Sequence, residues 1–421
     1  MYYSRMKYLL FAGMIALAAP RAHAAFGSQA DEDQQEQSKP QEEIPDFSNL
    51  NEYIYQPKTT LNLGMRNMAG IKATFTGKGL IPALPGEALL DPTLANVARL
   101  YHDGSVGPDG RSLTIDNGDG TRTAILAAPD GKTNTWGYAN ANQVTPDDLM
   151  TFNVYSAAMP NMDPVNKAAK RNNGVELSVS RDMGNIGKHL SWSIFGGVSI
   201  NDIQAATFGN VRANVTTVTD VYDLFGQTPQ TAGTSSPSAT TINVTDANGN
   251  QILDSTGANV TQAIDTSVLI GNQPLARTTS TVTDVVSVVD HWKLHGSYLT
   301  FRTGPSLVYA FNDHLKASLS VGPALIYAGS MYNVTEVFTP ASGDPIIDTL
   351  SNTTAKLVPA YYADATVQYD LNETTGFYFG GVYQNGGSYM QTASSTNAGT
   401  YSTRVDFSNQ NGFRGGLSFK F

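Results

Sequence analysis

Apolar and polar residues alternate with a period of two along much of this chain. Between residues 361 and 371 every second residue is apolar, and the residues between them are polar and include Asp364 and Asp370. Segments 190–201, 401–408 and 413–421 alternate in the same way, and further stretches with strand character lie at 175–181, 298–311, 315–328 and 376–384. Because side chains on a strand point alternately to opposite faces, the pattern predicts strands with one apolar and one polar face.

Short polar segments separate several of these stretches and predict tight turns. They lie at 183–187, 312–314, 372–374 and 409–411, and they are rich in Asn, Asp and Gly. Residues of this kind favour hairpins, so an antiparallel arrangement is expected. A soluble sandwich shows similar alternation but buries each apolar face in a shared core. Strands of about 9–11 residues with an uncharged face instead predict an all-β, antiparallel transmembrane β-barrel of about 10–12 strands.

The last strand carries a more specific pattern. Its apolar positions include Phe413, Leu417, Phe419 and Phe421, and the chain ends on this last aromatic residue. The strand resembles the C-terminal assembly signal of bacterial outer-membrane β-barrels. The resemblance covers one strand only, and it implies an outer-membrane location, contact with outer-membrane lipids and recognition by the barrel-assembly machinery.

The N-terminal residues predict export. Arg5 and Lys7 precede an apolar run from 8 to 19, and Ala22-His23-Ala24 supplies a signal-peptidase site, so residues 1–24 are expected to be a cleaved signal peptide. The sequence has no cysteine, which excludes disulfides and a lipid-modified cysteine. Residues 25–57 read as an acidic flexible arm, and the net charge of −10 argues against nucleic acid as a partner.

The barrel is expected to occupy residues 58–421, with two interruptions. Residues 77–172 lose the alternation and are predicted to form a plug, a cap or a loop, and residues 226–274 are predicted to form a protruding insertion. Counting strands back from Phe421 places the turns near Asn409, Asn372 and Asp313 at the side where long loops are usual. Either a strand is miscounted or the inner connections are long.

The charged face supplies the candidate functional residues. Arg302, Asp364, Asp370, Arg404 and Asp406 are expected to point into the lumen. They would line a water-filled pore or crosslink a closed lumen. The first alternative predicts a porin-like channel for passive diffusion of small hydrophilic solutes. The second predicts a non-conducting structural or adhesive surface barrel that uses the 226–274 insertion to bind partners.

Other chemistry has little support in the sequence. His291 and His295 on one strand would lie about 13 Å apart, too far to share one metal ion. Serine and histidine occur near each other, but serine is so common here that no nucleophile–base pair stands out. We therefore expect no enzyme activity, no cofactor and no bound metal, while the oligomeric state stays open.

Overall fold

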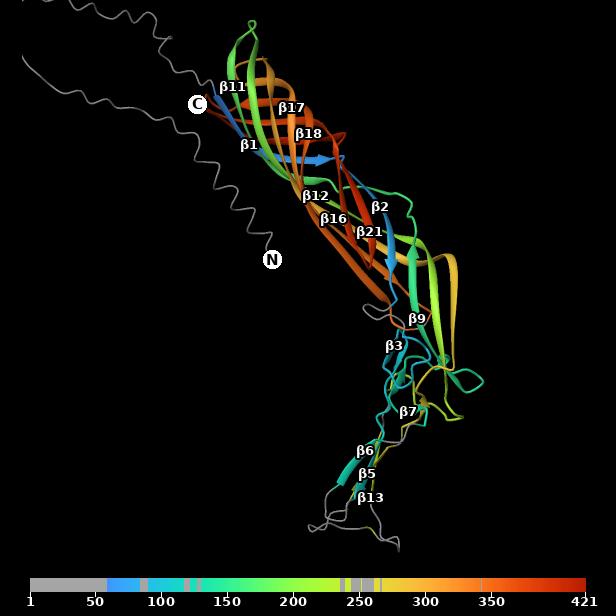
Figure 1. Cartoon of the computed structure of the whole chain (residues 1–421). Helices are drawn as coiled ribbons and strands as arrows, with labels where there is room; N and C mark the ends of the chain where they lie inside the picture. The colour runs from blue at the N-terminus through green and yellow to red at the C-terminus, as the bar shows by residue number, and fades with distance from the viewer. Residues whose placement is uncertain are drawn as a thin grey trace, which may run out of the picture. The chain divides into compact units, whose positions relative to one another are not determined.

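The computed structural model describes residues 59–83, 90–116, 122–126, 130–234, 239–243, 251, 261–265, 267–341 and 343–421. The signal peptide and the acidic arm expected from the sequence lie outside these residues. Most of the described chain is strand, and the largest sheet is antiparallel throughout (Figure 1). No helix within the described residues is long and apolar enough to cross a membrane.

Eight strands close into a first ring. Around it the order is β1 (Thr59–Ala69), β22 (Gln410–Lys420), β19 (Thr375–Gly386), β18 (Ile346–Asp370), β17 (Leu315–Phe338), β16 (Ala276–Ala310), β12 (Leu190–Asp223) and β11 (Asn172–Asn185). The ring closes because β11 pairs with both β1 and β12. The all-β barrel class expected from the sequence is confirmed.

Four of these strands continue into a second part of the barrel. Strands β12, β16, β17 and β18 run on, and the remaining wall is made by β9 (Leu149–Met159), β2 (Lys72–Ile81), β21 (Gly399–Asp406) and β20 (Ser388–Ser395). A short strand β10 (Val165–Ala168) also pairs with β2. No hydrogen-bonded ladder joins β20 to β18 among the described residues, but the Gln391 side chain donates to the Asn352 carbonyl at 2.6 Å. This second ring therefore has a seam that a side chain bridges.

The number of strands depends on whether broken strands are counted as one strand or as two, since the large sheet has 13 strands when each segment is counted. β1 and β2 are two segments of one strand interrupted at Gly70, where φ is +105°, and β21 and β22 are likewise interrupted near Asn409, where φ is 57°. Eight of these strands close the first ring, and the others continue the sheet beyond it. The segment at 409–411 is a break within a strand and not a hairpin turn.

Because of this break, the short turns all lie at one end of the ring. Backbone hydrogen bonds join Thr59 to Phe421 and Lys420 to Thr374. The turn at 371–374 therefore lies at the same end of the ring as Thr59 and Phe421. The turns at 311–314 and 186–189 lie at the same end, linked by the bonds from Asp370 to His314 and from Ala310 to His189. The long connections leave the opposite end, which is the usual arrangement in outer-membrane barrels.

The outer surface of the first ring is apolar and exposed. The side chains that point outward carry no charge over the middle of each strand and include Leu63, Met65, Val175, Leu177, Phe301, Leu319, Val367, Phe379, Phe413 and Leu417. Strands β1 and β22 have 11 residues each, the length that crosses a bilayer. A continuous exposed apolar surface marks a site of contact with a membrane or a partner. We infer that the first ring is the membrane-spanning part.

The second ring has the opposite arrangement. Its interior is an apolar core built around Phe75, Trp292, Tyr332 and Phe407, while Lys72 and Arg404 lie exposed on its outer face. The lipid-facing role expected for the apolar residues of 401–408 is therefore wrong, because Tyr401, Thr403, Val405 and Phe407 are buried inside the ring. An apolar interior with a polar exterior is the pattern of a barrel surrounded by water.

Short strands beyond the second ring form a cap. They are β3 (Arg99–Tyr101), β4 (Gly104–Val106), β5 (Ser112–Asp116), β6 (Arg122–Leu126), β7 (Lys132–Thr133), β8 (Trp136–Tyr138), β13 (Ala239–Asn243), β14 (Thr261–Asp265) and β15 (Ile270–Gly271), with one 3₁₀ turn, η3 (Ala141–Gln143). The early segment and the mid-chain insertion meet there, because β7 pairs with β15 and the Trp136 indole donates to the Val268 carbonyl at 2.8 Å.

Candidate functional site

The lumen of the first ring holds a buried network centred on Glu176. Its carboxylate accepts from Arg302 Nη2 at 2.6 Å and from Arg414 Nη1 at 2.8 Å, and it lies 3.4 Å from Arg66 Nε. Asp364 lies 3.7 Å from Arg302 and 3.6 Å from Arg414. The five residues come from β1, β11, β16, β18 and β22, so the network connects strands all around the ring.

This network is withdrawn from water. Glu176 is 0% exposed, and none of the four other members exceeds 4% exposure. Aromatic rings pack around the guanidinium groups, since Phe195 and Tyr362 each lie 5.4 Å from Arg302. Charges buried in this way are stable only when paired and hydrogen-bonded. The ion pairs of the network cross the lumen at this level.

The five lumen residues expected from the sequence fall in different places. Arg302 and Asp364 belong to the network. Asp370 is also buried but lies nearer the turns, where it pairs with Lys420 and with Lys316 at 3.1 Å. Arg404 and Asp406 lie on β21 in the second ring, where Arg404 is exposed and donates to Ser388 Oγ. Their expected inward orientation is wrong, because the apolar side of β21 faces the core.

The sequence interpretation missed two central residues. Arg66 alternates with Leu63 and Met65, and this period of two marks it as inward-pointing. Nothing local to Glu176 marks it out, because its three arginine partners lie far away in the sequence. Only the closed ring brings Arg66, Arg302 and Arg414 to one carboxylate.

A second polar group interrupts the apolar core of the second ring. Asp290 and Glu336 stand directly opposite each other on β16 and β17, and both are fully buried. The Tyr401 hydroxyl donates to Glu336 Oε1 at 2.5 Å. No cationic side chain forms an ion pair with either carboxyl group within the described part of the chain.

Burial sets the protonation of this pair. It raises the pKa of Asp290 to about 7 and that of Glu336 to about 8. In the unfolded chain both groups titrate near pH 4, so the folded state binds more protons between pH 4 and 8. The free energy of unfolding therefore falls as the pH rises through this window and levels off above it. At neutral pH Glu336 is largely protonated and Asp290 is about half protonated, so the pair carries less than one full negative charge on average.

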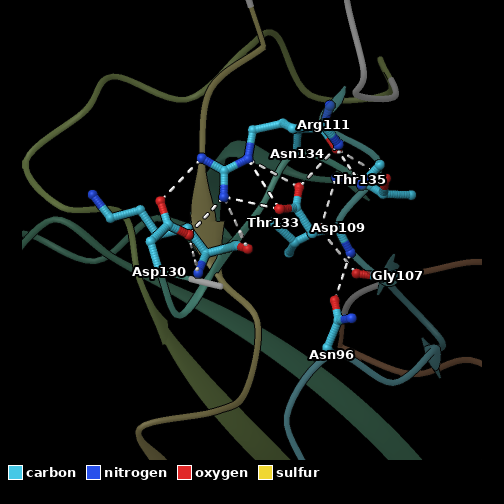
Figure 2. A network of polar contacts seen from close by, with 10 residues as sticks. Asn96, Gly107, Asp109, Arg111, Asp130, Thr133, Asn134 and Thr135 are labelled. Carbon is cyan, nitrogen blue, oxygen red and sulfur yellow. Dashed lines mark hydrogen bonds and ion pairs between the residues drawn. The ribbon is translucent and has the colours of Figure 1, made fainter. Parts of the chain in front are cut away.

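The cap contains a third polar group, centred on Arg111 (Figure 2). Its guanidinium lies between two carboxylates, with Nη2 at 2.9 Å from Asp109 and 2.6 Å from Asp130. Hydrogen bonding to Arg111 lowers the pKa of Asp130 to about 2. Asn96 and Asn134 accept backbone hydrogen bonds from the same loop, at 2.7 Å from Asp109 N and 2.9 Å from Gly110 N. The group joins three loops of the cap, and no cluster of His, Asp and Glu side chains that could hold a metal ion occurs within the described residues.

The four residues assigned to the assembly signal are exposed. Phe413, Leu417 and Phe419 are exposed on the lipid-facing side of β22, and Phe421 follows its end. Their recognition by an assembly machinery stays a prediction.

Comparisons with known proteins give limited information. No protein-family model matches this sequence, and no curated protein matches it. Among solved structures, the chain is similar to the outer membrane protease OmpT of Escherichia coli, with 8% identity, a TM-score of 0.28, and coverage of 86% of this chain and 96% of that one. A FadL homologue of Pseudomonas aeruginosa gives 8% identity, a TM-score of 0.18, and coverage of 86% and 90%. An anion-selective porin of Comamonas acidovorans gives 9% identity, a TM-score of 0.12, and coverage of 86% and 100%. At these identities and TM-scores, none of the three bears on what this chain does.

Proposed function

We propose that this chain is a closed, non-conducting barrel of the bacterial outer membrane that holds a binding surface outside the bilayer. The observation that carries the proposal is the fully buried Glu176, which pairs with three arginines across an eight-stranded ring. A ring of eight strands has an interior just wide enough for side chains to fill. Of the two alternatives expected from the sequence, this geometry favours the sealed barrel over the porin-like channel.

The second ring supports the same conclusion. A solute that passed the ionic network would next meet a packed apolar core that includes Phe75, Trp292 and Tyr332. A channel for hydrophilic solutes needs a continuous hydrated path lined by polar groups. Two consecutive obstructions of different chemistry leave no such path through the described residues.

An outer-membrane location is supported by the apolar belt together with the terminal strand. Short turns at the end where Thr59 and Phe421 lie and long connections at the other end match the barrels of that membrane. The long connections then lie outside the cell. They form the second ring and the cap, which the membrane-spanning ring does not need for its own closure, so we assign the binding role to them. The proposal gives the barrel no catalytic role.

Conductance across a planar lipid bilayer tests the proposal. The purified chain, shown to be folded by heat-modifiable gel mobility, is expected to add no channel steps. A double variant, Arg302→Ala with Arg414→Ala, removes two of the side chains that cross the lumen. Its conductance is compared with that of the unmodified chain at equal incorporation. Stepwise current from the unmodified chain, with an ion selectivity that shifts in Asp364→Asn, would overturn the proposal and restore the porin-like reading.

A further inference from the structure

The outer face of the barrel changes from apolar to polar where the strands are broken. On β1 the side chains at odd positions point outward, as Met65 does, whereas on β2 those at even positions do, beginning with Lys72. The break at Gly70 causes this change, because it shifts the alternation by one residue. The chain between β10 and β11 passes the same level, since the Ala169 N–H donates to the Ile71 carbonyl at 2.8 Å.

The lipid-facing belt ends next to this break. Met65 and Val175 stand opposite each other on β1 and β11, and both side chains are apolar and exposed. Two positions further on, Asn67 stands opposite Asn173, and its amide donates to Asn173 Oδ1 at 2.6 Å. Two residues of strand span about 7 Å, and the headgroup region on each side of a bilayer is roughly 5–8 Å thick. The two asparagines therefore lie at the level of the lipid headgroups.

Four positively charged side chains gather at the break, and we call them the basic cluster. They are Lys72 on β2, Lys167 on β10, and Lys170 and Arg171 between β10 and β11. All four are exposed, and none forms an ion pair with a carboxylate of the described residues. Arg171 reaches the headgroup level, since its Nη1 donates to Asn67 Oδ1 at 3.0 Å. Long, flexible stems extend the reach of the three lysines toward the same level.

The nearby carboxylates do not neutralise the basic cluster. Asp406 stands opposite Lys72 on β21, but its carboxylate accepts from the Ser408 backbone N–H at 2.8 Å rather than from the lysine. Asp202 on β12 accepts from the Ser297 hydroxyl at 3.1 Å. Even when both are counted, four positive charges against two negative ones leave a net charge of +2. The surface beside the belt is therefore cationic.

We propose that the basic cluster binds the anionic phosphate headgroups of lipids in the leaflet at this end of the ring. The cluster adjoins the lipid-facing belt, so lipid headgroups are the groups that lie beside it in a membrane. Its positive charge complements phosphate, which arginine contacts through paired hydrogen bonds and lysine as a point charge. The inference goes beyond the proposed function, because it needs the first ring to span a membrane but does not need a closed lumen.

Two other sources of negative charge fit the position less well. The acidic arm expected at 25–57 joins the chain at Thr59, which lies with Phe421 at the other end of β1. A strand of 11 residues crosses the bilayer, so this arm starts on the opposite side of the membrane. A soluble anion would meet the same charge but gains nothing from the belt. A lipid gains from both, because its acyl chains contact Met65 while its phosphate meets Arg171.

Lipid binding counted by native mass spectrometry tests the proposal. The full chain in a neutral detergent is titrated with phosphatidylglycerol and, separately, with phosphatidylcholine of the same acyl chains, whose headgroup has no net charge. We expect the unmodified chain to bind the anionic lipid at least about tenfold more tightly, since each cation near an anionic lipid contributes roughly fivefold. The variant that combines Lys72→Gln, Lys167→Gln, Lys170→Gln and Arg171→Gln is expected to lose this preference while retaining heat-modifiable mobility.

Lys72→Gln and Lys78→Gln form a matched pair, because both lysines are exposed on β2 but Lys78 lies six residues further from the belt. Lys72→Gln should weaken binding of phosphatidylglycerol by about fivefold, and Lys78→Gln should leave it unchanged. Equal effects of the two, no preference in the unmodified chain, or an undiminished preference in the combined variant would overturn the inference. Displacement of the lipid by millimolar inorganic phosphate would assign the cluster to a soluble anion and also overturn it. Channel activity, measured separately, would refute only the proposed function.

Discussion

The lumen network predicts a large cost for neutralising Glu176. In Glu176→Gln the side chain keeps its size but loses its charge, so three arginines then face Asp364 alone. Removing one partner of a buried ion pair leaves an uncompensated charge and costs about 3–5 kcal/mol. Because Glu176 accepts short hydrogen bonds from two arginines and is fully buried, we expect a loss of free energy of unfolding in this range.

Urea unfolding in lipid vesicles, followed by tryptophan fluorescence, measures this loss. Glu373→Gln is the matched control, since Glu373 lies exposed in the turn between β18 and β19 and should change the stability by less than about 0.5 kcal/mol. Combining Glu176→Gln with Arg302→Met should recover part of the loss, because it removes one of the unpaired charges. A loss below about 1 kcal/mol would contradict the reasoning, since it would mean that water hydrates the network.

Three further predictions concern other parts of the barrel. As the pH rises from about 4 to 8, the free energy of unfolding should fall because Asp290 and Glu336 lose protons that the folded state binds; Asp290→Asn with Glu336→Gln should flatten this slope, measured by thermal unfolding across the pH range. Gly64→Ala should cost about 1–3 kcal/mol because its Cβ would overlap the Tyr378 hydroxyl and a backbone carbonyl, whereas Gly196→Ala meets open space and should cost far less when both are compared in urea. Arg111→Leu should separate the loops of the cap and increase limited proteolysis there without changing heat-modifiable mobility.

Each of these predictions has a clear contrary result. An unchanged pH slope in the double acid variant would show that other groups control the titration. Equal stabilities of the two glycine variants would show that the backbone near Gly64 relaxes easily. Proteolysis of Arg111→Leu at the rate of the unmodified chain would show that apolar packing, rather than the ion pairs, holds the cap together.

Which face of a strand is polar could be predicted from the sequence, but its environment could not. The alternation at 361–371 correctly puts Asp364 and Asp370 inside. The same kind of alternation at 401–408 led to the wrong orientation for Arg404 and Asp406. Strands in the first ring contact lipid outside and ion pairs inside, while those in the second contact water outside and an apolar core inside. Alternation with period two is identical in both cases.

The sequence by itself determined the antiparallel β class, the apolar face of the terminal strand and the tight turns at 312–314 and 372–374, because these depend on local periodicity and on residues that favour turns. Only the tertiary structure decided the ring of eight strands, the breaks at Gly70 and Asn409, and the meeting of Glu176 with arginines from three other strands. The pairings of β1 with β11 and β22, which close the ring, join residues that are more than 100 positions apart. No local pattern encodes which of them become partners.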